Sequence, residues 1–219
     1  MTGLYVYGIT RSPVRTRTRG VFGRTLRTVQ VGRLHVIVER AEMAPRPAMP
    51  TLNAQSRAIA ALVAAGTDVL PARFGAFVSD VAELHRMIGA RGAHLARALR
   101  LVKGRVQMTV RVRMERPLER RTATKAVGGT EYLRARAARA SGRRSDPLLR
   151  AIQAAAKPYA RATEVDWQEG PTAMARVHHL VPRGRVAAYA EAVSRAVQRH
   201  EADAVMSGPW APFAFVEAA

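Results

Sequence analysis

Three of the chain's scarce aromatic side chains stand close together near its end, at Trp210, Phe213 and Phe215. Pro209 and Pro212 each fix φ and remove a backbone donor, so this run should begin as extended chain rather than as a central strand. From Phe213 onward the period of two predicts a terminal strand with an aromatic face. Such a segment suits docking to an apolar partner. It equally suits a strand that closes the core of its own domain, where Trp and Phe at structural spacing most often lie.

Arg73 is the one charged residue in the otherwise apolar run 69–75. A guanidinium is planar, permanently charged and presents its donors in a fixed fork. It could orient a partner by binding a carboxylate or backbone carbonyl groups, or it could be a structural arginine that holds this strand to the loop after Gly75. Arg73, Trp210, Phe213 and Phe215 are therefore the candidate partner-binding residues.

The chain lacks the patterns on which common catalytic and cofactor sites depend. It has no Walker-type loop, no dinucleotide fingerprint, no His-Glu-x-x-His helix and no nucleophile elbow. Without cysteine there can be no disulfide, thiolate metal site or cysteine nucleophile. His178 and His179 are adjacent, and neighbouring strand residues point to opposite faces, so they should not share a metal ion. We expect no enzyme activity, no cofactor and no metal.

The net charge of +20 and the pI near 11.7 raise an alternative function, because arginine clusters gain affinity for phosphate by counterion release. The positive charge gathers in residues 11–27, 111–125 and 134–150. However, few aromatics are available for base stacking, and no RNA-recognition or KH motif is present. An Arg-rich and Lys-poor composition is also typical of GC-rich coding sequence. The alternative is thus a basic protein that binds nucleic acid without sequence preference.

Hydrophobic periodicity and turn residues predict an α+β fold in which sheets, antiparallel or mixed, are covered by helices. Ser145-Asp146-Pro147 is a strong helix start, and Gly66 and Gly32 mark a helix end and a hairpin turn. The charged stretch 115–129 predicts a linker between two domains, 1–114 and 130–219. The expected strands are 4–9, 25–31, 34–39, 69–74, 106–112, 162–168, 174–182 and the aromatic ending, and the expected helices are 52–66, 79–99, 130–140, 145–159 and 186–200.

The chain is also expected to be a cytoplasmic protein. The apolar run at its start is too short for the core of a signal peptide. The longest apolar helical run, 58–65, is far below the ~20 residues that span a bilayer.

Three segments in order resemble the signatures of one known family, the gas vesicle protein L/F family. Leu-Pro-Ala-Arg-Phe-Gly at 70–75 is similar to its central element, and Gly-Thr-Glu-Tyr-Leu at 129–133 is similar to a helix start. The ending Gly-Pro-Trp-Ala-Pro-Phe-Ala-Phe-Val at 208–216 resembles its C-terminal signature, with alanine at 211 where proline is usual. With the opening strand at 4–9, the resemblance extends from one end of the chain to the other.

The resemblance implies ferredoxin-like domains and a non-enzymatic function at the gas vesicle. It implies a gas vesicle assembly factor or minor structural component. Its partners would be the small, very hydrophobic major shell protein and further gas vesicle proteins. In this interpretation Trp210, Phe213 and Phe215 are apolar anchors and Arg73 is an orienting group.

Overall fold

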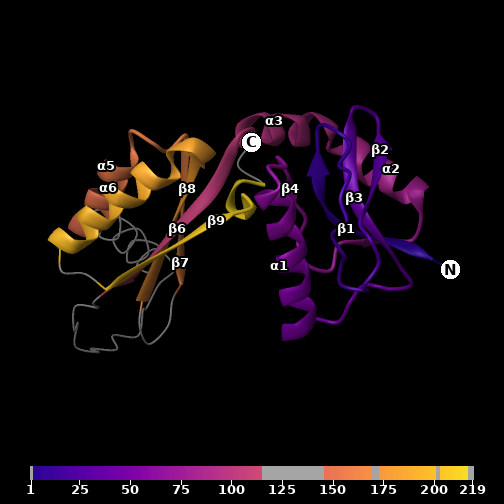
Figure 1. Ribbon diagram of the computed structural model, residues 1–219, viewed down its shortest axis with the longest axis horizontal. Coiled ribbons are helices and arrows are strands. Elements are labelled where there is room, and N and C mark those ends of the chain that lie inside the picture. The colour runs from indigo at the N-terminus through magenta and orange to yellow at the C-terminus, as the bar shows by residue number, and fades with distance from the viewer. Residues whose placement is uncertain (1, 115–145, 169–172, 201–202, 217–219) are drawn as a thin grey trace, which may run out of the picture. The chain divides into compact units, whose positions relative to one another are not determined.

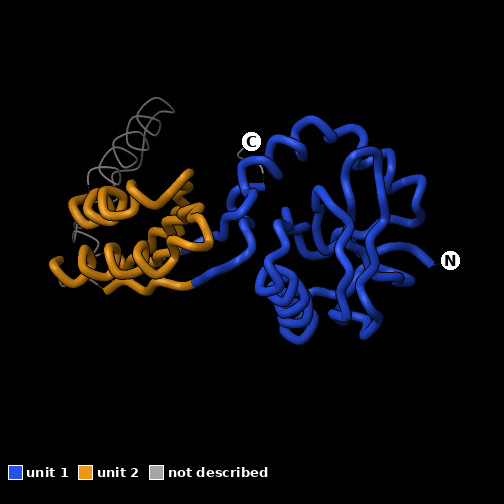
Figure 2. The backbone as a smooth tube through the Cα atoms, turned by 45° about the horizontal axis from the view of Figure 1, so that its top comes forward, with its two compact units in different colours: residues 1–108, 208–219 blue, residues 109–207 orange. Residues whose placement is uncertain are grey.

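The computed structural model describes residues 2–114, 146–168, 173–200 and 203–216. The chain forms two compact units, residues 1–108 with 208–219 and residues 109–207 (Figure 2). The predicted linker 115–129, the predicted helix 130–140 and the Gly-Thr-Glu-Tyr-Leu segment lie outside the described residues. The division into domains at 115–129 therefore stays a prediction.

Helices and strands occur in both units, and Figure 1 labels them along the chain. In chain order the strands are β1 Gly3–Thr10, β2 Arg27–Val31, β3 Leu34–Ala41, β4 Leu70–Pro71, β5 Phe77–Val78, β6 Arg105–Met114, β7 Ala162–Gln168, β8 Ala173–Pro182 and β9 Ala204–Trp210. The helices are α1 Met49–Ala64, α2 Val81–Ala90, α3 Gly92–Val102, α5 Pro147–Ala156 and α6 Val186–Arg199, with short 3₁₀ turns η1 Arg183–Arg185 and η2 Phe213–Phe215.

The first sheet has the order β2-β3-β1-β4, with β5 also paired to β1. All of its pairings are antiparallel. Val31 pairs with Leu34, so Gly32 and Arg33 form the predicted two-residue turn. Strand β4 is shorter than the predicted strand 69–74, but its Pro71 lies on an edge strand, where a residue without a backbone N–H is tolerated. Helix α1 contacts β1, α2 contacts β2 and β5, and α3 contacts β4.

Local signals explain where the helices of both units begin and end. The Asp80 carboxylate accepts a hydrogen bond from the Glu83 N–H at 2.7 Å and caps α2. The predicted single helix 79–99 is wrong in one respect, since the chain breaks at Arg91 into α2 and α3, close to the two glycines that weaken it. Asp146 caps α5 through the Leu149 N–H at 3.0 Å, and Pro147 occupies the first turn, as predicted.

The second sheet has the order β7-β8-β6-β9, and β7 and β8 are antiparallel. Helices α5 and α6 pack on each other, and α6 packs on β8. The buried side chains of the two helices in the core of this unit include Leu149, Ile152, Tyr189 and Val193, and β8 adds Val177. The predicted α+β class, with helices associated with each sheet, is confirmed. The ferredoxin-like assignment stays a prediction.

Candidate partner-binding site

The aromatic ending begins where β9 meets β6 at close range. Gly208 has a φ of +127°, and a Cβ there would lie 2.8 Å from the backbone oxygen of Gln107 and 2.8 Å from the sulfur of Met108. Only glycine fits both the dihedral angle and the space. The following Gly208–Pro209 bond is cis. The entry into the aromatic segment is therefore set by backbone packing against the start of β6.

Beyond Trp210 the chain does not continue as a strand, and the prediction of a terminal strand over Phe213 and Phe215 is wrong. Ala211 and Pro212 are buried, and residues 213–215 form the 3₁₀ turn η2. The Phe213 N–H donates to the Ala211 carbonyl at 2.8 Å, and the Phe215 N–H donates to the Pro212 carbonyl at 3.1 Å. Local turn bonds thus use the backbone groups that a strand ladder would need.

Two side chains of the first unit hold η2 in place. The Gln107 side-chain oxygen accepts a hydrogen bond from the Ala214 N–H at 2.9 Å, and His94 Nε2 lies 3.2 Å from the Val216 carbonyl. The carbonyl of Val216 accordingly lies beside α3, which carries His94. Phe215 is fully buried. The aromatic ending is therefore packed on the first unit, with one ring in the core and two hydrogen bonds to fixed side chains.

The three aromatic residues separate into two environments. Trp210 and Phe213 are each 46% exposed, whereas Phe215 is 0% exposed. Phe215 thus closes the core of its own unit, whereas Trp210 and Phe213 are each only about half covered. Tryptophan is among the residue types enriched at the strongest anchor positions of protein interfaces. About half of the Trp210 and Phe213 side chains is therefore accessible to a partner. Phe215 is buried and fixes the position of the segment that carries them.

Arg73 lies in the loop between β4 and β5 and is exposed. The loop is anchored by several hydrogen bonds: the Tyr5 hydroxyl accepts from the Gly75 N–H at 3.1 Å, Gln55 Nε2 donates to the Ala72 carbonyl at 3.3 Å, and the Ala76 N–H donates to the Arg73 carbonyl at 3.3 Å. The Tyr5 hydroxyl itself donates to the Gln55 side-chain oxygen. The Arg73 guanidinium is thus presented from a well-anchored loop of the same unit that carries the aromatic ending.

A buried carboxylate, which the sequence analysis missed, organises the neighbouring loop. Glu39 is 1% exposed and accepts hydrogen bonds from the Tyr7 hydroxyl at 2.7 Å, the Phe22 N–H at 3.2 Å and the Arg24 N–H at 2.8 Å. The Tyr7 hydroxyl accepts in turn from the Val21 N–H. Burial, with the hydrogen bond to Glu39, raises the pKa of Tyr7 well above its ordinary value. One signal was visible in the sequence, a single acidic residue at the end of the apolar run 36–38.

The two adjacent histidines of β8 contact different groups. His178 Nδ1 lies 2.9 Å from the Thr109 hydroxyl and its Nε2 lies 3.2 Å from the Asp166 carboxylate. His179 Nδ1 lies 2.8 Å from the Tyr189 hydroxyl of α6. Burial first, and then the neighbouring His178, lowers the pKa of His179 to about 4. His179 is thus a neutral core residue, and within the described ranges no group of three His, Asp or Glu side chains could hold a metal ion.

A cavity of about 240 Å³ lies in the second unit between α6 and strands β6 and β9. Its lining is mostly apolar, with Val110, Val193, Val197 and Met206 beside Ser194 and Gln198. None of the candidate partner-binding residues lines it. In the part of the chain that the structure describes, no helix has the length and apolar character needed to cross a membrane.

The two-unit α+β fold is shared with solved gas vesicle proteins. GvpF from Anabaena sp. PCC7120 superposes with a TM-score of 0.77 at 16% identity, covering 99% of this chain and 98% of that one. GvpF from Microcystis aeruginosa superposes with a TM-score of 0.78 at 15% identity, covering 98% of each chain. At these identities the likeness defines the fold.

Sequence comparison defines the family. Residues 3–217 match the family described as gas vesicle synthesis protein GvpL/GvpF. The chain is 31% identical over 242 residues to gas vesicle protein F of Streptomyces sp. (strain CB03234), across 97% of this chain and 99% of the relative. The protein belongs to the GvpL/GvpF family of gas vesicle synthesis proteins.

Proposed function

We propose that this protein is a non-enzymatic gas vesicle assembly factor or minor structural component that binds the hydrophobic major shell protein in the cytoplasm, at the forming vesicle. The observation that carries the proposal is the pair of half-exposed rings at Trp210 and Phe213, held on a segment that Phe215 and Gln107 fasten to the first unit. Family membership supplies the gas vesicle context.

The chemistry of the partner explains why such rings are useful. A very hydrophobic shell protein must expose apolar surface before it is incorporated, and that surface aggregates unless it is covered. Rings that are already immobilised bind at little cost in conformational entropy, because the segment is ordered before the partner arrives. Tryptophan is also the residue type most enriched among strong interface anchors.

The remaining candidate residues take supporting roles in this proposal. Phe215 is buried, so we assign it to holding the segment rather than to touching the partner. Arg73 is exposed on an anchored loop, where its guanidinium can bind carbonyl or carboxylate groups of the partner and orient it.

Co-expression of the full chain with the major shell protein, followed by affinity capture, tests the proposal. We expect the shell protein to be retained by the unsubstituted chain. The double variant Trp210→Ala/Phe213→Ala should lose roughly 30-fold in affinity, the equivalent of about 2 kcal/mol at an interface anchor. Phe22→Ala, which truncates another partly exposed ring of the same unit, is the matched control and should retain the partner.

Two results would contradict the proposal. One is retention of the shell protein by the double variant at the level of the unsubstituted chain. The other is a failure to retain the shell protein at moderate salt while nucleic acid is retained, which would favour the basic nucleic-acid-binding alternative.

A further inference from the structure

Residues 14–19, which we term the arginine edge, run antiparallel to residues 24–28, where the chain enters β2, the terminal strand of the first sheet. The Leu26 N–H donates to the Thr18 carbonyl at 3.0 Å, and the Gly20 N–H donates to the Arg24 carbonyl at 2.9 Å. Arg19 and Thr25 form the antiparallel bridge between these two bonds. At the other end, the Thr28 hydroxyl bonds both the N–H and the carbonyl of Val14. The arginine edge is therefore the outermost extended segment of this side of the sheet.

The backbone of the arginine edge has one side bonded and the other open. The Thr18 carbonyl accepts from the Leu26 N–H of the neighbouring segment, and the Thr18 N–H donates to the Thr16 hydroxyl at 3.1 Å. In extended chain the backbone groups of alternate residues point the opposite way from the Thr18 carbonyl. Arg15, Arg17 and Arg19 are those alternate residues. Their N–H groups find no acceptor among the residues that the structure describes. The open side thus offers the donors and acceptors of an unpaired strand.

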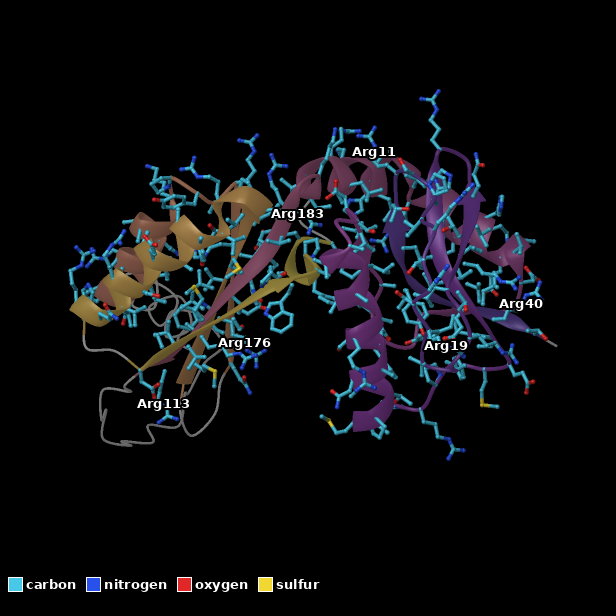
Figure 3. All side chains as sticks on the ribbon, in the orientation of Figure 1. Arg11, Arg19, Arg40, Arg113, Arg176 and Arg183 are labelled. Carbon is cyan, nitrogen blue, oxygen red and sulfur yellow. The ribbon has the colours of Figure 1, made fainter. Side chains whose placement is uncertain are left out.

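The exposure of the side chains along the arginine edge alternates with the same period of two residues. Arg15, Arg17 and Arg19 are exposed, and Thr16 and Thr18 between them are half-buried. Residues two apart in extended chain share a face and are separated by about 7 Å. The exposed side chains of Arg15, Arg17 and Arg19 therefore share one face of the open strand, and Figure 3 labels Arg19 among them.

The nearby carboxylates leave this charge available. Residues 11–42 contain eight arginines and two carboxylates, Glu39 and Glu42. Glu39 is buried, and its oxygens accept from Tyr7, Phe22 and Arg24 backbone or hydroxyl groups instead of guanidinium groups. The guanidinium groups of Arg19 and Arg24 bond the carbonyls of Gly23 and Arg40. Glu39 thus folds the loop that follows the arginine edge without neutralising its arginines.

We infer that the arginine edge is a docking site for an extended acidic segment of a partner protein, which adds as a strand and places a carboxylate at every second residue opposite Arg15, Arg17 and Arg19. Strand addition supplies affinity through the backbone, and alternate side chains supply specificity. Side chains of opposite charge attract each other across paired strands, whereas side chains of like charge repel. The arginine edge of a second copy of this chain would therefore not pair with it. A polynucleotide lacks the alternating donors and acceptors of a peptide backbone. The site is separate from the aromatic ending, so neither proposal depends on the other.

The test measures fluorescence anisotropy of two labelled peptides with the full-length protein at physiological salt. One peptide alternates Glu and Thr over about eight residues, and the other has the same composition with its Glu residues in one block. We expect the alternating peptide to bind about 10-fold more tightly or better, because only its carboxylates fall on one face of a strand. Equal affinity would overturn the inference, since nonspecific charge attraction would then explain the binding.

Variants locate the site. Arg17→Glu should weaken the alternating peptide by about 10-fold or more, whereas Arg17→Lys should cost less than about 3-fold because the charge is kept. Arg57→Glu makes the same change in charge on the exposed face of α1 and is the matched control. Thermal melts by circular dichroism establish that each variant is folded. Equal losses for Arg17→Glu and Arg57→Glu would overturn the inference, as would displacement of the alternating peptide by an oligothymidylate of equal charge at a lower concentration.

Discussion

The Gln107 side-chain oxygen accepts a hydrogen bond from the Ala214 N–H at 2.9 Å, joining the start of β6 to the 3₁₀ turn that carries the aromatic ending. Gln107 is 6% exposed, so this bond is partly shielded from bulk water. A buried polar group that holds a distant segment is expensive to remove, because its former partner cannot recover a hydrogen bond.

Gln107→Leu should therefore lower the free energy of unfolding by about 1–3 kcal/mol, since the Ala214 N–H is left without an acceptor. Urea unfolding followed by circular dichroism measures the change. Gln30→Leu is the matched control: Gln30 is exposed on β2, and its substitution should alter stability by less than about 0.5 kcal/mol. Equal effects of the two substitutions would show that the bond does not hold the segment.

Phe215 and Trp210 should differ in what their truncation costs. Phe215→Ala empties a fully buried position and should cost about 3–5 kcal/mol through lost burial and a cavity. Trp210→Ala removes a residue that is 46% exposed, so it should cost less than half as much. Thermal unfolding of both variants checks the order. A larger loss for Trp210→Ala would mean that its ring is mainly a core group.

Gly20→Ala should destabilise the first unit because its Cβ would collide with the Glu39 carboxylate and the Tyr7 hydroxyl. Overpacking of this kind costs about 1–3 kcal/mol. Gly89→Ala is the control, and it should raise the stability instead of lowering it. A Cβ there meets nothing within 4 Å, and alanine favours a helix over glycine by about 0.5–1 kcal/mol. Chemical denaturation of the two variants should show one loss and one gain. An unchanged midpoint for Gly20→Ala would contradict the tight packing around Glu39.

His179 should make stability depend on pH in the acidic range. Its folded pKa is lowered to about 4 from 6.5, so the unfolded chain binds the proton first as pH falls. The stability contributed by neutral His179 is complete above pH 6.5 and is lost progressively as pH falls toward 4. A shift of this size corresponds to about 3 kcal/mol. Urea midpoints measured across this range should fall for the unsubstituted protein and fall less for His179→Leu. Parallel curves for the two proteins would assign the dependence to other groups.

The sequence by itself determined most of the secondary structure and the family. The hairpin across Gly32 and Arg33 and the caps at Asp80 and Asp146 are local features, because a turn or a cap depends on residues within a few positions. The α+β class followed from hydrophobic patterns of period two, typical of strands, that occur along the same chain as patterns of period 3.6, typical of helices. The motifs at 70–75 and 208–216 led to the gas vesicle family, to which residues 3–217 are matched.

Only the tertiary structure decided which aromatic rings are accessible. The period of two after Phe213 suits a strand, but a period says which residues share a face and not what covers that face. Gln107, more than a hundred positions earlier, takes the Ala214 N–H, and the turn bonds of η2 take those of Phe213 and Phe215. Long-range hydrogen bonds therefore outweighed the local pattern. The same reason applies to Glu39, whose donors come from β1 and from the loop between residues 20 and 24.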